Sequence, residues 1–166
     1  MITISEKKLQ EAGALGIDEF LQVFIDAYLE ALDGNLTADN MHLLNGNQHS
    51  LLAYYFLREE VMQGGFVQLI QNGYGGYVFD NPTAKALKQF GATDTAKIVY
   101  KAKDIFDFNR EELERETTEE EFMAMYVDFE QFDELEEMFF EIEEEQTAII
   151  AQYVDENIAK FGEVAK

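Results

Sequence analysis

Large apolar residues recur every three or four positions through residues 104–145, a segment that is otherwise dominated by acidic side chains. The segment holds nineteen Asp or Glu residues against two basic ones, Arg110 and Arg115, and so carries −17 of the chain's net charge of −22. The apolar residues threaded through it are Phe122, Met125, Tyr126, Phe129, Phe132, Leu135, Met138, Phe139 and Ile142. Because this spacing places apolar side chains on one face of an α-helix, the segment is predicted to fold and to hold its carboxylates in fixed positions.

The rest of the chain also favours helices, because it contains one proline and little alternation of β-branched residues. Ser5 is a predicted N-cap of the first helix, and a second helix is expected from Asp18 to Leu32. Thr118 and Glu121 have the spacing of a reciprocal capping box. The last helix is expected from Gln131 to Phe161 and is the longest.

The length and composition limit the class of protein. A chain of 166 residues fits one domain, and we predict an all-α fold, a single compact multi-helix domain of residues 1–166 with a long acidic C-terminal helix. The absence of cysteine removes disulfides and thiolate chemistry and favours a reducing, cytoplasmic location. No apolar run is long enough to cross a bilayer and no secretory signal is expected, so no membrane partner is predicted. The negative charge repels nucleic acid and attracts basic proteins, which excludes direct nucleic-acid binding.

No arrangement of residues typical of catalysis or of a metal site stands out. His42 and His49 are seven positions apart and lack the Glu-x-x-His pattern of a di-metal bundle. The oxygen side chains of residues 104–112 lack the spacing and the central glycine of a calcium loop. Neither serine, Ser5 or Ser50, lies in a nucleophile elbow. We therefore predict no enzyme activity, no cofactor and no metal.

Two motifs in the middle of the chain resemble a known family. Residues 60–75 read EVMQGGFVQLIQNGYG, and residues 84–102 read AKALKQFGATDTAKIVYKA. They resemble a bacterial DNA-mimic protein family of small acidic helical proteins with an E-V-x-x-G-G-F-x-Q-x-x-x-N signature followed by a helix reading A-L-x-x-x-G-A. The signature residues here are Glu60, Val61, Gly64, Gly65, Phe66, Gln68 and Asn72. The resemblance implies a shared helical scaffold and a protein that binds a helix-turn-helix transcription factor in place of its operator.

The signature also has a purely structural interpretation. Paired glycines followed by Phe66 allow a sharp turn between two helices with close backbone packing. Glu60, Gln68 and Asn72 are expected to satisfy backbone groups around that turn. The motif therefore marks the scaffold and does not by itself define the activity.

A row of five glutamates falls on one side of the last predicted helix. These are Glu130, Glu134, Glu137, Glu141 and Glu144, at spacings of four, three, four and three. Like-charged neighbours at this spacing repel each other by a few tenths of a kcal/mol per pair, so the row does not serve helix stability. If the two acidic helices expected at residues 109–125 and 131–145 lie side by side, their charge density approaches that of duplex DNA.

We predict that this acidic segment binds the DNA-binding surface of a basic protein, most simply a helix-turn-helix transcription factor, and blocks its binding to DNA. The predicted partner-binding residues are Asp107, Glu111, Glu114, Glu119, Glu120, Asp128, Glu130, Asp133, Glu134, Glu137, Glu141 and Glu144. A homodimer would present two such arrays to the two halves of a dimeric repressor. Two alternatives remain. One is an immunity or antitoxin-type protein that neutralises a basic toxin or nuclease through the same surface. The other is a helical domain whose acidity serves only solubility.

Overall fold

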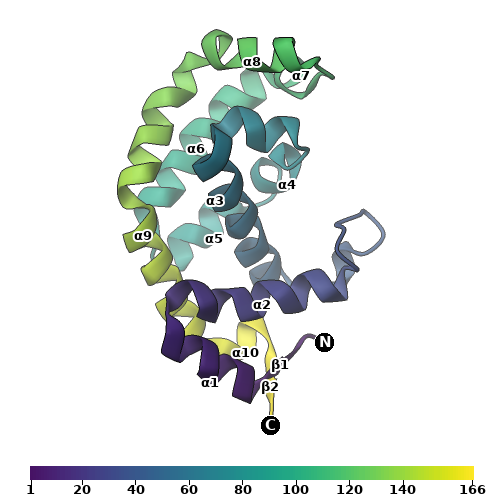
Figure 1. Cartoon of the computed structure of the whole chain (residues 1–166), viewed down its shortest axis with the longest axis vertical. Helices are drawn as coiled ribbons and strands as arrows, with labels where there is room; N and C mark the ends of the chain where they lie inside the picture. Colours follow the sequence, from purple (N-terminus) through teal and green to yellow (C-terminus); the bar gives the residue numbers. More distant parts are fainter. The chain divides into compact units, whose positions relative to one another are not determined.

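The computed structural model describes residues 1–166, which group into two compact units (Figure 1). Unit 1 comprises Met1–Leu52 and Thr147–Lys166, and unit 2 comprises Ala53–Gln146. The boundaries fall within the two longest helices, α3 (Gly46–Gln71) and α9 (Asp133–Glu156). Helices make up most of both units, which confirms the predicted all-α class with its long acidic C-terminal helix. The single domain stays a prediction.

Unit 1 joins the two ends of the chain. It contains β1 (Thr3–Ser5), α1 (Glu6–Leu15), α2 (Ile17–Ala31), η1 (Met41–Leu43), the start of α3, the end of α9, α10 (Ile158–Phe161) and β2 (Glu163–Ala165). Ser5 caps α1 as predicted, since its Oγ accepts a hydrogen bond of 3.3 Å from the N–H of Lys8. β1 and β2 pair in parallel, with Ile4 opposite Val164. The sequence does not predict these strands, because three residues are too few to show an alternation.

The core of unit 1 closes around the end of α10. Phe24, Tyr28 and Phe161 are fully buried. The hydroxyl of Tyr28 donates to the carbonyl of Phe161 at 2.6 Å, and the side-chain amide of Gln48 donates to the same carbonyl at 3.1 Å. Burial raises the pKa of Tyr28 above its usual range, so this hydroxyl remains a donor.

Unit 2 contains the acidic segment. It consists of the rest of α3, α4 (Gly75–Phe79), α5 (Thr83–Gln89), α6 (Thr93–Phe108), α7 (Arg110–Glu114), α8 (Glu119–Asp128), η2 (Glu130–Phe132) and the first part of α9. In Figure 1, α7 and α8 lie at one end of this unit and α9 runs away from that end. None of the helices of the chain is both long enough and apolar enough to cross a membrane.

Buried aromatic rings form the core of unit 2. Phe66 packs against Phe132 with 5.3 Å between ring centroids and against Phe79 at 6.4 Å, and Phe79 packs against Phe106 at 5.0 Å. Phe132 and Phe139 belong to the acidic segment and are almost completely buried. The prediction that apolar residues fix this segment to the domain is therefore confirmed.

Two predicted helices are shorter in the structure. The helix expected at 131–161 is divided into η2, α9 and α10, and the helix expected at 109–125 is divided into α7 and α8. The second division has a local cause: Arg115 has extended backbone angles, and Thr118 begins a new helix as an N-cap.

Candidate functional site

The paired glycines produce the break predicted within α3. Gly65 has a φ of +76°, in the left-handed region that favours glycine. A Cβ at this position would collide with the carboxylate of Glu136 from α9. That carboxylate accepts a hydrogen bond of 2.7 Å from the backbone N–H of Phe66. Residue 65 must therefore be glycine for two reasons, its backbone angle and the close approach of a carboxylate.

A second side chain from the acidic segment reaches the same turn. The hydroxyl of Tyr126 on α8 donates to the carbonyl of Gly64 at 2.8 Å. Residues 64–66, hereafter the glycine turn, are thus bound by both α8 and α9. The consequence is that the signature motif holds in place the helices that carry the acidic side chains.

Partial burial shifts the ionisation of the groups at the glycine turn. Desolvation raises the pKa of the Glu136 carboxyl, the hydrogen bond from Phe66 opposes this rise, and the negative charge of Asp133 adds to it. Desolvation and the charge of Glu136 together raise the pKa of Tyr126. Glu136 therefore holds α9 on the turn and is half-buried, unlike the exposed carboxylates of the segment.

The polar residues of the signature bond to one another. Glu60 Oε2 accepts from the side-chain amides of Gln68 at 2.8 Å and Asn72 at 2.9 Å. The hypothesis that these three side chains satisfy backbone groups of the turn is wrong, because Tyr126 and Glu136 bind those groups instead. The three residues form a clamp across the kink, which links the two straight parts of α3.

Gln71 holds the connection between α7 and α8, and nothing in the sequence pattern singles it out. Its amide nitrogen donates to the carbonyls of Leu113 at 2.5 Å and Arg115 at 3.0 Å. Its amide oxygen accepts from the hydroxyl of Thr117 at 2.7 Å. One side chain at the end of α3 therefore orders the turn at residues 115–118.

The predicted capping box begins α8 immediately after this turn. Thr118 Oγ1 accepts from the N–H of Glu121 at 3.2 Å, and the Glu121 carboxylate accepts from the N–H of Thr118 at 3.1 Å. The backbone hydrogen bond from Thr118 and the side-chain hydrogen bond from Arg115 lower the pKa of Glu121. Glu121 is thus committed to the helix start.

Both arginines of the acidic segment are already bound by carboxylates. Arg110 pairs with Asp80 and Glu114, and Arg115 pairs with Glu112 and Glu121, all at 2.8 or 2.9 Å. Arg110 also lies over the ring of Phe106, with 4.8 Å from its Cζ to the ring centroid. Each of these two arginines therefore forms ion pairs with two carboxylates at this end of unit 2, and its charge is already neutralised.

The twelve predicted partner-binding carboxylates are all exposed. They are Asp107, Glu111, Glu114, Glu119, Glu120, Asp128, Glu130, Asp133, Glu134, Glu137, Glu141 and Glu144, hereafter the acidic surface. Asp107 pairs with Lys103 at 2.7 Å and Glu114 with Arg110 at 2.8 Å, whereas the other ten make no ion pair. Two glutamates of the segment are withdrawn from the surface: Glu136 at the glycine turn, and Glu143, which is buried against Arg58 at 2.9 Å.

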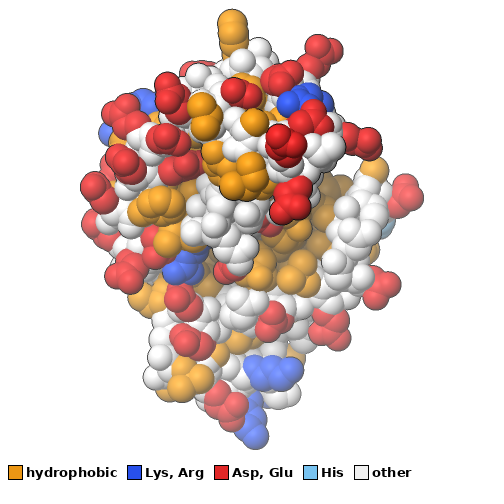
Figure 2. Space-filling view, turned by 45° about the horizontal axis from the view of Figure 1, so that its top comes forward, with side chains coloured by type: hydrophobic (Ala, Val, Ile, Leu, Met, Phe, Trp, Pro, Cys, Tyr) orange, Lys and Arg blue, Asp and Glu red, His pale blue; other side chains and the backbone are white.

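The acidic surface has two parts. Glu130, Glu134, Glu137, Glu141 and Glu144 are exposed along η2 and the first part of α9, and the other members lie on α7, α8 and the adjoining ends of α6 and α9. Figure 2 shows acidic side chains far outnumbering basic ones, with apolar side chains between them. Because α8 lies across the end from which α9 runs away, the carboxylates form a row and a cluster, not two parallel rows (Figure 1).

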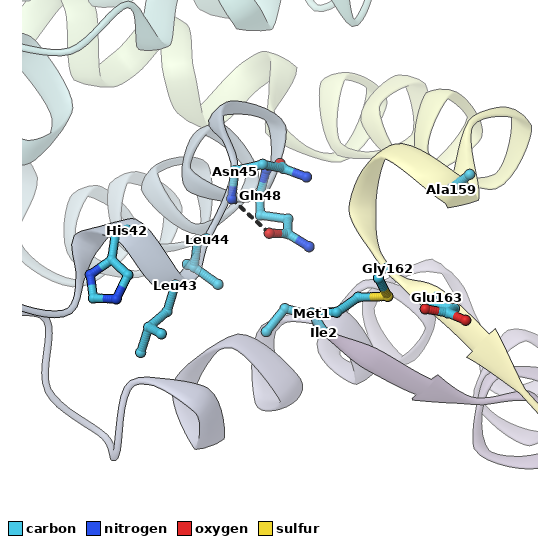
Figure 3. A pocket seen from close by; sticks show the side chains of 10 residues that line it. All are labelled: Met1, Ile2, His42, Leu43, Leu44, Asn45, Gln48, Ala159, Gly162 and Glu163. Atoms are coloured by element: carbon cyan, nitrogen blue, oxygen red, sulfur yellow. Dashed lines mark hydrogen bonds between the residues drawn. The ribbon is translucent and has the colours of Figure 1, made fainter.

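Unit 1 has a separate hollow of about 600 Å³ (Figure 3). Its lining residues are Met1, Ile2, His42, Leu43, Leu44, Asn45, Gln48, Ala159, Gly162 and Glu163. The buried amide of Gln48 accepts from the N–H of Asn45 at 2.8 Å and donates to Phe161, so its hydrogen-bonding groups are satisfied within the protein. The structure places no group of three or more His, Asp or Glu side chains where they could hold a metal ion. We assign no ligand to this hollow.

The glycine turn that anchors α8 and α9, together with the row of unpaired carboxylates on η2 and α9, places this chain in the class of small, acidic helical proteins. The chain belongs to the family of DMP19-like proteins, whose model matches residues 42–157. The matched region includes both the glycine turn and the acidic segment, and the match confirms the resemblance inferred from the signature. The chain is also similar to the DNA mimic protein DMP19 of Neisseria meningitidis serogroup B, with 29% identity over 160 residues that cover 95% of this chain and 92% of that protein.

Proposed function

We propose that this protein is a DNA mimic that occupies the DNA-binding surface of a basic protein and prevents it from binding DNA. The observation that carries the proposal is the exposure of ten carboxylates that make no ion pair, on a surface whose arginines are already neutralised. A positively charged DNA-binding surface could form ion pairs with these carboxylates. The similarity to a protein named as a DNA mimic supports the same function.

The spacing of the glutamate row can be compared with the spacing of phosphates along DNA. Carboxylates three or four residues apart on a helix stand roughly 5 Å apart along its axis. Phosphates of one DNA strand stand about 3.4 Å apart along the duplex. The α9 row alone is therefore sparser than a DNA strand, and the cluster on α7 and α8 supplies further charge. A partner that exchanges its counterions for these carboxylates would bind with a strong dependence on salt.

A purely solubilising role explains this surface less well. Lysines between the glutamates would keep the chain solvated and would remove the repulsion within the row, yet η2 and α9 carry no basic residue. The protein also buries part of one further carboxylate, that of Glu136, to fix α9 in place. The repulsion within the row and the partial burial of Glu136 both lower the stability of the fold. A charged surface that is kept despite such a cost is typical of a binding surface.

The partner that we favour is a cytoplasmic transcription factor with a helix-turn-helix domain. Such a domain places a recognition helix in the major groove and surrounds it with basic contacts to phosphates, and both features lie on one face. The protein would then regulate transcription by competition and without chemistry of its own. It would not bind nucleic acid directly, because its own charge repels phosphates.

The experiment that tests this function is a competition between the protein and DNA for one partner. The tagged full-length chain is used to capture partners from cells of its own organism at low salt, and the captured protein is then titrated with its operator DNA. Release of the captured partner by operator DNA supports the proposal. Capture of a nuclease or toxin whose activity is inhibited would instead support an immunity role, and capture of nothing in low salt would contradict both.

A further inference from the structure

Helix α8 carries apolar side chains on its outer side as well as on its inner side, between its four carboxylates. The inward-facing ones are Phe122, Met125 and Tyr126, which are buried or half-buried, and Phe129 directly after the helix is buried as well. On the opposite side Met123 and Val127 are 59% and 75% exposed, and Ala124 between them is exposed as well. Exposed apolar side chains that are rimmed by charged residues are typical of interaction surfaces. The outer side of α8 is therefore a candidate binding surface.

Helical geometry gathers the outer apolar residues into one stripe. At 3.6 residues per turn, Met123, Ala124 and Val127 fall within one third of the circumference, and we name them the α8 stripe. Glu119 lies on one side of the stripe and Asp128 on the other. Both carboxylates are exposed and make no ion pair. An apolar strip between two anionic edges is thus presented to solvent.

The flanking charges indicate what covers the α8 stripe. Glu120, one turn before Ala124, adds a third exposed carboxylate at the N-terminal end of the stripe. A second copy of this chain would bring Glu119, Glu120 and Asp128 of both copies into one interface, where like charges repel most strongly. A basic surface would instead pair with these carboxylates and bury the apolar side chains at the same time. Charge complementarity therefore favours a basic partner over self-association.

Duplex DNA offers the same combination of groups in its major groove. The groove is about 12 Å wide, lies between two phosphate rows, and exposes thymine methyl groups as its apolar contacts. A helix with its side chains is roughly 10–12 Å across, so the two edges of α8 are separated by a comparable distance.

We propose that the α8 stripe takes the place of thymine methyl groups, and that it binds an apolar side chain which the partner carries between its basic residues. This inference rests on the proposed function and narrows the partner class: a DNA-binding protein that reads thymine methyls in the major groove. The carboxylates then supply the salt-dependent part of the affinity, and the stripe supplies a part that salt does not screen.

Two synthetic peptides test the inference even before the partner is identified. Both are helical and carry the same number of lysines. One has leucines at positions i and i+4 between the lysines, and the other has glutamines at those positions. Each is labelled with a fluorophore and titrated with the full-length chain from low to high salt, with binding followed by fluorescence anisotropy. The leucine peptide is expected to bind on the order of tenfold more tightly than the glutamine peptide, with the same dependence on salt.

The variant that removes the stripe is Met123→Ser with Val127→Ser, and its matched control is Leu15→Ser with Val164→Ser, which changes two exposed apolar residues of unit 1. Circular dichroism and thermal unfolding establish that both variants are folded. The advantage of the leucine peptide is expected to vanish in the stripe variant and to remain in the control.

Three results would overturn the inference. They are equal binding of the two peptides to the unaltered chain, an undiminished leucine advantage in the stripe variant, and a dimer in sedimentation velocity that only the stripe variant dissolves. Failure of the proposed function has a different signature, because it is measured in the capture experiment and not with the peptides: no DNA-binding protein is captured at low salt, or operator DNA does not release the captured protein.

Discussion

The carboxylate of Glu136 accepts a hydrogen bond of 2.7 Å from the backbone N–H of Phe66, directly beside the position where a Cβ on Gly65 would collide with it. Phe66 also stacks on Phe132, four residues before Glu136, with 5.3 Å between ring centroids. The glycine turn and the acidic segment therefore meet at one point. This contact explains how a motif with no chemistry of its own determines where a charged surface stands.

Loss of the Glu136 side chain should destabilise unit 2. In Glu136→Ala the N–H of Phe66 loses its acceptor, and an unsatisfied, partly buried N–H costs about 1–3 kcal/mol. Glu136→Gln keeps an acceptor oxygen and should cost clearly less. The free energies of unfolding of the two variants, measured in urea at one pH, give this difference. If both variants lose the same free energy of unfolding, the hydrogen bond is not what holds α9.

The glycine turn should not tolerate a side chain at residue 65. Gly65→Ala combines an unfavourable positive φ, which costs a non-glycine residue about 1 kcal/mol or more, with displacement of the Glu136 carboxylate. The matched change Gly46→Ala has no neighbour within contact distance of the new Cβ and lies at a negative φ, so it should leave stability within about 0.5 kcal/mol. The free energies of unfolding of the two variants test this contrast. A stable Gly65→Ala protein would mean that the turn can rearrange.

The raised pKa of Glu136 predicts a particular pH dependence. Because the folded-state pKa lies above the unfolded value, the folded state binds the proton more tightly. The resulting contribution to stability is fully present below the unfolded value and is lost as pH rises through the folded value. Stability of the unaltered chain relative to Glu136→Gln should therefore increase as pH falls from neutral toward the unfolded carboxyl pKa. Repulsion elsewhere is common to both proteins and cancels in the comparison, so a constant difference across pH would contradict the assignment.

Gln71 should matter for the order of the α7–α8 connection. Gln71→Ala leaves the carbonyls of Leu113 and Arg115 and the hydroxyl of Thr117 without their partner, at a cost of about 1–3 kcal/mol. Gln131→Ala, at an exposed glutamine of the same segment, is the control and should be nearly neutral. Amide hydrogen exchange at residues 113–118 provides the local readout. Faster exchange there in the first variant alone is the expected result.

Local signals predicted the parts of the structure that depend on neighbouring residues. The caps at Ser5 and Thr118 and the kink at Gly65 each follow from a few adjacent side chains and were confirmed. The contacts that set the place of the acidic segment join residues far apart, such as Tyr126 with Gly64. Periodicity carries no information on such pairs. It also gives no sign that Glu136 and Glu143, two of the nineteen acidic residues of the segment, are drawn away from the surface by partners that only the fold reveals.

Removing negative charges from the row of glutamates on α9 tests the proposed binding surface directly. Replacement of Glu137, Glu141 and Glu144 by Gln removes like-charged neighbours at helical spacing, so stability should stay the same or rise by a few tenths of a kcal/mol per relieved pair. Affinity for the captured partner should fall, and the slope of the logarithm of affinity against the logarithm of salt concentration should become shallower, because fewer ion pairs form. The control is replacement of Glu19, Glu30 and Glu163 by Gln, three exposed glutamates of unit 1 that change the net charge by the same amount. If both triple variants weaken binding equally, net charge alone attracts the partner. If only the first does, the row is the binding surface.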